Sequence, residues 1–163
     1  MVMAEQDTQE LLMRLESAPA RFGAALARLE DADSVAGGPA EEWTPAQVLA
    51  HVRASNDILE TRILQVLVRD EPPLPAFDER RWCEVAKYET LPIIESLGAM
   101  RARRRELVRA LRDLGPEEWE RGGLHETRGR LTLTEIARHI ADHDDEHIQQ
   151  IEQVATASER EET

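Results

Sequence analysis

The sequence predicts an all-α protein and, more narrowly, a four-helix bundle. Hydrophobic residues make up 41% of the chain but aromatic residues only 4%, so aliphatic side chains supply the apolar surface, as is typical of helices. Apolar residues recur at three- and four-residue steps in four long segments, and the alternation typical of strands is nearly absent. A chain of 163 residues fits one domain, which we expect to span residues 1–163 with a disordered tail over 159–163.

The first helix is predicted over residues 7–29. Its apolar stripe consists of Leu11, Leu12, Leu15, Phe22, Leu26 and Leu29. Pro19 lies inside this segment and cannot donate a backbone hydrogen bond, so we expect a kink or a break near Ala18. Residues 31–40 contain two glycines and a proline and predict a loop.

The second helix has the strongest start signal in the chain. Thr44 is the predicted N-cap, Gln47 completes a capping box with it, and Pro45 fits the first helical position. The helix should end at about Arg69, because three prolines follow within residues 71–75.

Two further long helices follow a short irregular region. We expect a short helix near residues 82–88 and a long one over residues 91–114, which Gly115 and Pro116 end. A loop with a short turn should occupy residues 117–129. A second capping box, Thr132 with Glu135, then begins the fourth long helix, which should run to about Ala157.

Three of the five histidines lie in the fourth helix, four residues apart, at positions 139, 143 and 147. Each step of four residues turns a helix by only about 40°, so the three imidazoles share one face. The same stripe carries Ile136, Ile140, Gln150, Ile151 and Val154. The acids Asp142, Asp144 and Asp145 flank this stripe, and we expect them to belong to a solvated outer face.

His51 repeats this pattern on the second helix, because it shares a face with apolar residues. Two helices that each place imidazole on a buried stripe can bring His51, His143 and His147 together as ligands of one metal ion. Neutral imidazole is the commonest metal ligand, and three protein ligands leave open positions for water or substrate, as in catalytic sites. The alternative is that each histidine is a hydrogen-bonded core residue.

Charge and cysteine content exclude several classes of partner. The chain has 33 acidic and 20 basic residues, a net charge of −13, so duplex nucleic acid is an unfavourable partner. The single Cys83 cannot form an internal disulfide, which favours a reducing, cytoplasmic location. No apolar run approaches the ~18 residues of a membrane-spanning helix, and the N-terminus lacks the features of a signal peptide. We therefore expect a cytoplasmic protein with no membrane partner.

Two segments resemble a known family. Residues 131–151 (LTLTEIARHIADHDDEHIQQI) resemble the last-helix signature of the DinB-like, or YfiT-like, superfamily, and residues 42–52 (EWTPAQVLAHV) resemble its second-helix motif. Trp119, with the two glutamates before it, also fits the pattern. The resemblance covers most of the chain, from about Glu42 to Gln153.

The resemblance implies an up-down-down-up bundle and a divalent metal ion, nickel or zinc, held by His51, His143 and His147. The resemblance also implies a homodimer. It further implies a small-molecule substrate, because characterised relatives include S-transferases that use a low-molecular-weight thiol. We therefore predict a metal-dependent enzyme such as a thiol S-transferase. The alternatives are a metal-dependent hydrolase and a non-enzymatic, metal-stabilised stress-response or dimerisation module.

Other patterns have simpler interpretations. The sequence HDDEH over residues 143–147 differs from the HExxH of metalloproteases at its second position, and no histidine follows it. Cys83 has no neighbouring base and is interpreted as structural. His125 either approaches the site or lies on the surface. The tryptophans are interpreted as core residues: Trp43, Trp82 and Trp119. A basic cluster in the third long helix predicts a solvated face or an anion-binding rim: Arg101, Arg103, Arg104, Arg105, Arg109 and Arg112.

Overall fold

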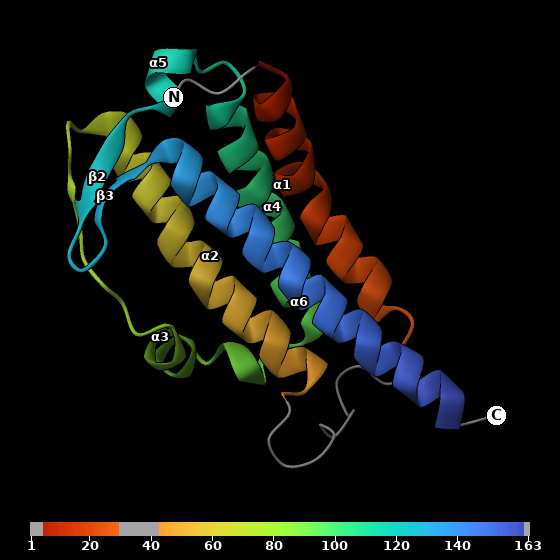
Figure 1. Cartoon of the computed structure of the whole chain (residues 1–163). Coiled ribbons are helices and arrows are strands. Elements are labelled where there is room, and N and C mark those ends of the chain that lie inside the picture. Colours follow the sequence, from red (N-terminus) through yellow and green to blue (C-terminus); the bar gives the residue numbers. More distant parts are fainter. Residues whose placement is uncertain (1–4, 30–42, 162–163) are drawn as a thin grey trace.

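Four long helices form the body of the protein. The computed structural model of the chain describes residues 5–29 and 43–161, and the predicted loop over 31–40 lies outside them. The long helices are α1 (Glu5–Leu26), α2 (Pro45–Val68), α4 (Ile93–Leu111) and α6 (Leu133–Glu161). Figure 1 shows that α1 and α6 run in one direction and that α2 and α4 run in the other. This confirms the four-helix bundle of up-down-down-up type.

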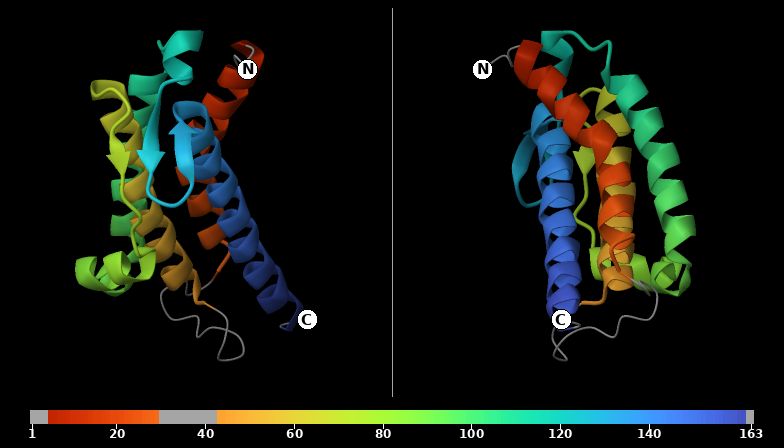
Figure 2. Two further views of the ribbon diagram at one scale, coloured as in Figure 1. Left: turned by 60° about the vertical axis from the view of Figure 1, so that its left-hand side comes forward. Right: turned by 90° about the vertical axis from the view of Figure 1, so that its right-hand side faces the viewer.

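The four helices close around a shared core. Helices α1 and α2 each pack against both α4 and α6, and the two views of Figure 2 show the four helices packed lengthwise. The predicted apolar stripes point inward. The largest fully buried apolar side chains are Leu15, Phe22, Leu49, Ile63, Leu74, Leu111, Trp119, Leu133, Ile140, Ile148 and Ile151. None of the helices in the described residues is long and apolar enough to cross a membrane.

A long connection makes the parallel arrangement of α2 and α4 possible. After α2 the chain passes through β1 (Pro73–Leu74), α3 (Glu79–Ala86) and the 3-10 helix η1 (Tyr88–Thr90) back to the start of α4. Helix α3 begins earlier than the predicted short helix, because the Asp78 side chain caps it by accepting from the Arg81 backbone N–H at 2.9 Å. It packs against α2, beside the start of that helix (Figure 1).

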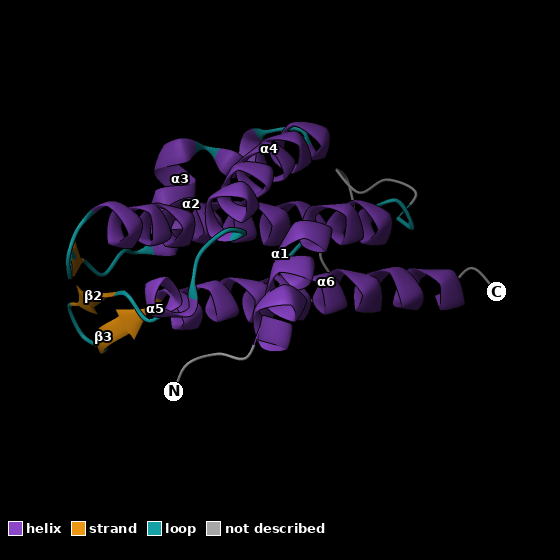
Figure 3. Cartoon of the chain, turned by 90° about the horizontal axis from the view of Figure 1, so that it is seen from above, coloured by secondary structure: helices purple, strands orange, loops and turns teal. Residues whose placement is uncertain are grey.

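A small sheet, which the sequence pattern did not predict, contacts both α2 and α6. Strand β2 (Gly122–His125) follows the short helix α5 (Pro116–Trp119), pairs antiparallel with β3 (Gly129–Thr132) and pairs parallel with β1. Figure 3 shows β2 and β3 at the end of the molecule where α2 finishes and α6 begins. The loop predicted over residues 117–129 therefore contains most of α5 and all of β2, and the strands left no sign in the sequence because two to four residues are too few to show a period of two.

The two predicted capping boxes are confirmed, and they define where the histidine-bearing helices begin. At α2 the Gln47 backbone N–H donates to Thr44 Oγ1 at 3.2 Å, and the Thr44 N–H donates to Gln47 Oε1 at 3.0 Å. At α6 the Glu135 N–H donates to Thr132 Oγ1 at 3.1 Å, and the Thr132 N–H donates to Glu135 Oε2 at 2.7 Å. Because side chains repeat every 3.6 residues, a fixed start also fixes which face carries the imidazoles.

Of the predicted kink or break near Ala18, the break does not occur: helix α1 continues through Pro19, and the right-hand view of Figure 2 shows α1 bending part-way along its length. A proline leaves the carbonyl four residues earlier, here that of Leu15, without its helical donor. In this protein the Leu15 carbonyl accepts instead from Nη1 of Arg104 on α4, at 3.1 Å. The orphaned acceptor is therefore satisfied by a neighbouring helix.

Only one of the three tryptophans is a core residue. Trp119 is buried as predicted, with 1% of its surface exposed. Trp43 and Trp82 are each 36% exposed, so the prediction of a core position is wrong for both. Both lie outside the ring of four long helices: Trp43 precedes α2, and Trp82 lies on α3.

Candidate metal centre

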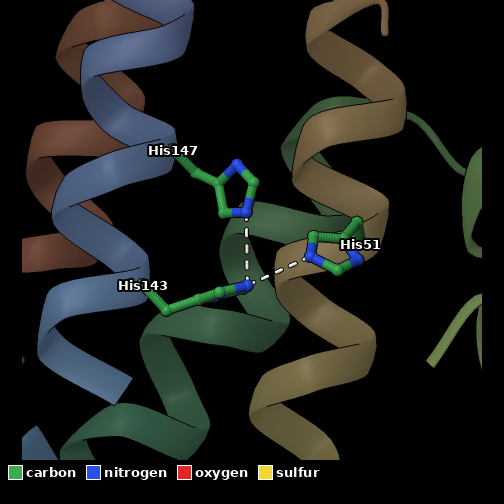
Figure 4. Close-up of side chains that lie close together, drawn as sticks. All are labelled: His51, His143 and His147. Atoms are coloured by element: carbon green, nitrogen blue, oxygen red, sulfur yellow. Dashed lines mark hydrogen bonds between the residues drawn. The ribbon is translucent and has the colours of Figure 1, made fainter. Parts of the chain in front are cut away.

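Three histidines from two facing helices converge near the middle of the bundle. His51 lies on α2, and His143 and His147 lie one turn apart on α6. Figure 4 shows the three imidazoles turned toward one another across the gap between these helices. All three are half-buried. The structure thus brings together the three residues that the sequence spacing and the family resemblance had selected.

The separations suit a single ion. Nε2 of His143 lies 3.0 Å from Nε2 of His51 and 3.2 Å from Nε2 of His147. One ring nitrogen from each of the three residues lies within 4.8 Å of the other two. Two nitrogens at about 2.0–2.1 Å from a tetrahedral Zn²⁺ lie about 3.3 Å apart. The imidazoles therefore fit one ion with little movement.

Hydrogen bonding alone leaves this cluster incompletely satisfied. Nε2 of His143 faces two other ring nitrogens but has at most one hydrogen to donate. Its other ring nitrogen, Nδ1, is buried and has no hydrogen-bond partner among the described residues. A cation between the three nitrogens would turn the facing lone pairs from a repulsive into an attractive arrangement.

The surroundings of His51 and His143 keep these two imidazoles neutral. Burial, followed by the neighbouring His147, His51 and His139, lowers the pKa of His143 to about 3. Burial and His147 also lower the pKa of His51, and the carboxylates of Glu79 and Glu146 oppose this shift. Neutral imidazole is the form that binds metal ions, so the site favours the ligand state.

Gln150, a further residue of α6, orients His147. Nδ1 of His147 lies 2.9 Å from Oε1 of Gln150, an amide oxygen that can only accept. The hydrogen bond therefore places the proton on Nδ1 and leaves the lone pair on Nε2, the atom that faces His143. Gln150 shares the predicted stripe, but its spacing alone gave no reason to assign it a role.

A cavity of about 250 Å³ borders His51. The start of α2, helix α3 and η1 contribute its lining residues, which are Trp43, Gln47, His51, Arg80, Cys83, Glu84 and Glu89. The ring of Trp43 meets that of His51 edge-on, with centroids 4.9 Å apart. The sequence did not indicate this cavity, because α3 meets α2 only in the folded chain.

Cys83 is nearly buried in the wall of this cavity. Burial, and then the negative charge of Glu89, raises the pKa of its thiol. Its thiolate is therefore scarce at neutral pH, which fits the structural interpretation better than a nucleophilic one.

The other two histidines lie outside the cluster. His139 is exposed, and its ring centroid is 6.1 Å from that of His143. His125 ends β2, where its Nδ1 accepts from the backbone N–H of Thr127 at 3.2 Å. It therefore orders the β2–β3 turn.

Two charged residues predicted to face solvent lie in the core. Asp144 is 0% exposed and Arg104 is 1% exposed, and Arg104 Nη1 donates to Asp144 Oδ2 at 2.7 Å. The prediction that these residues belong to solvated faces is wrong. Helix α6 packs against both α1 and α2, so it buries a wider arc than its apolar stripe. Asp142 and Asp145 remain nearer the surface, where both pair with Arg14 of α1.

Comparison with known proteins agrees with this arrangement. The sequence profile of the DinB superfamily matches residues 14–151, which include all three clustered histidines. The chain belongs to the DinB superfamily. The structure of YfiT from Bacillus subtilis, described as a probable metal-dependent hydrolase with an unusual four-helix bundle topology, has a TM-score of 0.80 and 22% identity, and the match covers 93% of this chain and 89% of YfiT. The two proteins share a fold.

Two proteins of Oceanobacillus iheyensis are similar in sequence. Candidate metal-dependent hydrolase OB0782 is 29% identical over 109 residues, which cover 67% of this chain and 63% of that protein. Candidate metal-dependent hydrolase OB0413 is 22% identical over 146 residues, which cover 90% of this chain and 84% of that protein. The match thus spans less than two thirds of the first relative.

Proposed function

We propose that this protein is a divalent-metal-dependent enzyme that acts on a small molecule, with hydrolysis as its reaction. The observation that carries the proposal is the convergence of three imidazole nitrogens, 3.0 and 3.2 Å apart, beside a cavity that borders one of them. Hydrolysis is supported by the names of the Oceanobacillus iheyensis relatives and by the description of YfiT.

Each residue has a distinct task under this proposal. His51, His143 and His147 would hold the ion, Zn²⁺ or Ni²⁺, through Nε2, and Gln150 would hold His147 in the tautomer that leaves Nε2 free. When bound, such an ion acts as a Lewis acid and lowers the pKa of a water or thiol beside it. The cavity of about 250 Å³ would admit the substrate next to His51. Trp43 would shield one side of that imidazole.

Transfer of a low-molecular-weight thiol to an electrophile is the second candidate. The cavity beside His51 contains both a cation, Arg80, and two carboxylates, Glu84 and Glu89. This mixture suits a thiol that carries both an amino group and a carboxylate. In that reaction the thiol, rather than water, would be the activated nucleophile.

A paired activity screen tests the proposal and separates the two reactions. Zn²⁺- or Ni²⁺-loaded protein is assayed against activated esters and amides, and separately with cysteine-type thiols and a model electrophile. His143→Ala and wild-type protein treated with chelator serve as matched controls. We expect hydrolysis that both controls abolish. Thiol-dependent product alone would favour the transferase, and no turnover by a fully loaded protein would favour a metal-stabilised, non-enzymatic module.

A further inference from the structure

A buried ionic cluster joins all four long helices next to the histidines. Asp144 of α6 accepts from Arg104 Nη1 of α4 at 2.7 Å and from Asn56 Nδ2 of α2 at 3.3 Å. Arg104 Nε also donates to Glu60 of α2 at 3.2 Å, and its Nη1 donates to the Leu15 carbonyl of α1 at 3.1 Å. Four of these residues are buried side chains: Asn56, Glu60, Arg104 and Asp144. One guanidinium thus contacts every other helix of the bundle.

Such a cluster is a costly way to stabilise a core. Charges lose their hydration when they are buried, and apolar side chains of similar volume are often equally or more stabilising. The hydrogen bonds of an ionic cluster are directional, so they are all formed in only one relative position of the helices. Apolar contacts do not select one position in this way. The geometry fixed here is the position of α6 along and around α2.

That position is also what the three histidines require. Asp144 directly follows His143 on α6, and Asn56 lies five residues after His51 on α2, about 7.5 Å along the helix axis. The Asn56–Asp144 hydrogen bond and the 3.0 Å approach of His51 to His143 therefore connect the same two helices at neighbouring points. A metal site needs its ligands held to within about 0.5 Å, whereas apolar helix faces tolerate small slips.

We propose that Arg104 and Asp144 are positioning residues of the histidine cluster: their buried ion pair sets the register of α6 against α2 that places His143 and His147 opposite His51. This inference rests on the proposed metal-dependent function. It assigns a role to an aspartate that directly follows a candidate ligand in the sequence and whose carboxylate accepts from Arg104 and Asn56. It also accounts for Pro19, which frees the Leu15 carbonyl that Arg104 uses on α1.

The chain offers a matched pair of substitutions on either side of His143. Asp144→Asn removes the buried charge, whereas Asp142→Asn makes the same chemical change at a side chain that is 59% exposed. Val108→Ala, a buried position on α4, controls for a general loss of stability. If Asp144→Asn folds poorly, the double variant R104M/D144L removes both charges together and leaves Glu60 paired with Arg103, at 3.1 Å in the wild type.

Zn²⁺ affinity is measured by competition with a chromophoric chelator, and Co²⁺ absorption spectra report the coordination geometry. We expect Asp144→Asn and R104M/D144L to weaken Zn²⁺ binding by about 10- to 100-fold and to alter the Co²⁺ spectrum. Asp142→Asn and Val108→Ala should stay within about two-fold of wild type. The loss of Zn²⁺ affinity in each variant is compared with the drop in its unfolding midpoint. If Val108→Ala and Asp144→Asn lose the same affinity for the same drop, the loss follows from reduced stability alone and the inference is overturned.

Crystal structures without added metal decide the inference independently of any bound ion. In R104M/D144L we expect α6 to shift so that His143 Nε2 leaves hydrogen-bonding distance of His51 Nε2, which is 3.0 Å away in the wild type. An unchanged separation would overturn the positioning role. A wild-type protein that binds no Zn²⁺ would overturn the proposed function alone, because the metal-free structures would still test the register.

Discussion

Removal of the Gln150 side-chain oxygen should weaken metal binding without unfolding the protein. In Gln150→Leu, Nδ1 of His147 loses an acceptor at 2.9 Å, so the tautomer that bears its hydrogen on Nε2 becomes accessible. That tautomer cannot bind an ion through Nε2. Loss of a partner that orients a ligand typically costs 10- to 100-fold in metal affinity, or about 1.4–2.7 kcal/mol.

The assay is Zn²⁺ binding by isothermal titration calorimetry or chelator competition at pH 7.5. The neighbouring Gln149→Leu is the matched control, because Gln149 is exposed and lies beside the stripe rather than on it. Gln150→Glu should retain wild-type affinity, since a carboxylate also accepts from Nδ1–H. A Gln150→Leu protein that binds Zn²⁺ as tightly as wild type would refute the assignment of Gln150.

Three further predictions concern the framework around the site. Thr44→Ala should lower the free energy of unfolding by about 1 kcal/mol in urea titrations, and Thr44→Ser should restore it, because the hydroxyl caps α2. Gly122→Ala should destabilise by about 1–3 kcal/mol, because an added Cβ would lie 2.6 Å from the Leu131 carbonyl. At Gly98 an added Cβ would meet no atom within 4 Å outside the backbone of its own helix, so Gly98→Ala should instead stabilise the protein by about 0.5–1 kcal/mol. Thermal melts compare the two glycine variants. Cys83 should react with iodoacetamide more slowly than free cysteine at pH 7, with a rate that rises with pH, because burial raises its pKa and leaves less thiolate. Rapid modification of the folded protein at pH 7 would contradict that assignment.

The histidine cluster was predictable because it depends on rules that act within one helix. An i, i+4 pair on a capped helix shares a face whatever surrounds it, so His143 and His147 followed from spacing alone. His51 followed from the same rule on α2. The antiparallel approach of α2 and α6, which joins the two faces, came from the family resemblance and not from periodicity.

The parts that could not be predicted depend on contacts between helices. Periodicity assigned Asp144 to the surface, because one apolar stripe does not show that α6 packs on two sides. Arg104 belongs to an arginine-rich run, and only the position of its neighbours shows that this arginine is buried. The cavity beside His51 forms where α3 meets α2, a contact that no local pattern encodes.

The domain prediction, the homodimer and the cytoplasmic location remain expectations. Limited proteolysis tests the single domain, and gel filtration with light scattering tests the homodimer. The hydrogen bonds that the structure shows among the three histidines and Gln150 connect residues of a single chain.

Metal content is the most direct test of the central claim. Wild-type protein, His51→Ala, His143→Ala and His147→Ala are each incubated with excess Zn²⁺, desalted and analysed by inductively coupled plasma mass spectrometry, with His139→Ala and His125→Ala as controls. We predict one ion per chain in the wild type and both controls, and a loss of bound metal in each of the other three variants. A full complement of metal in His143→Ala, the central member of the cluster, would contradict the account.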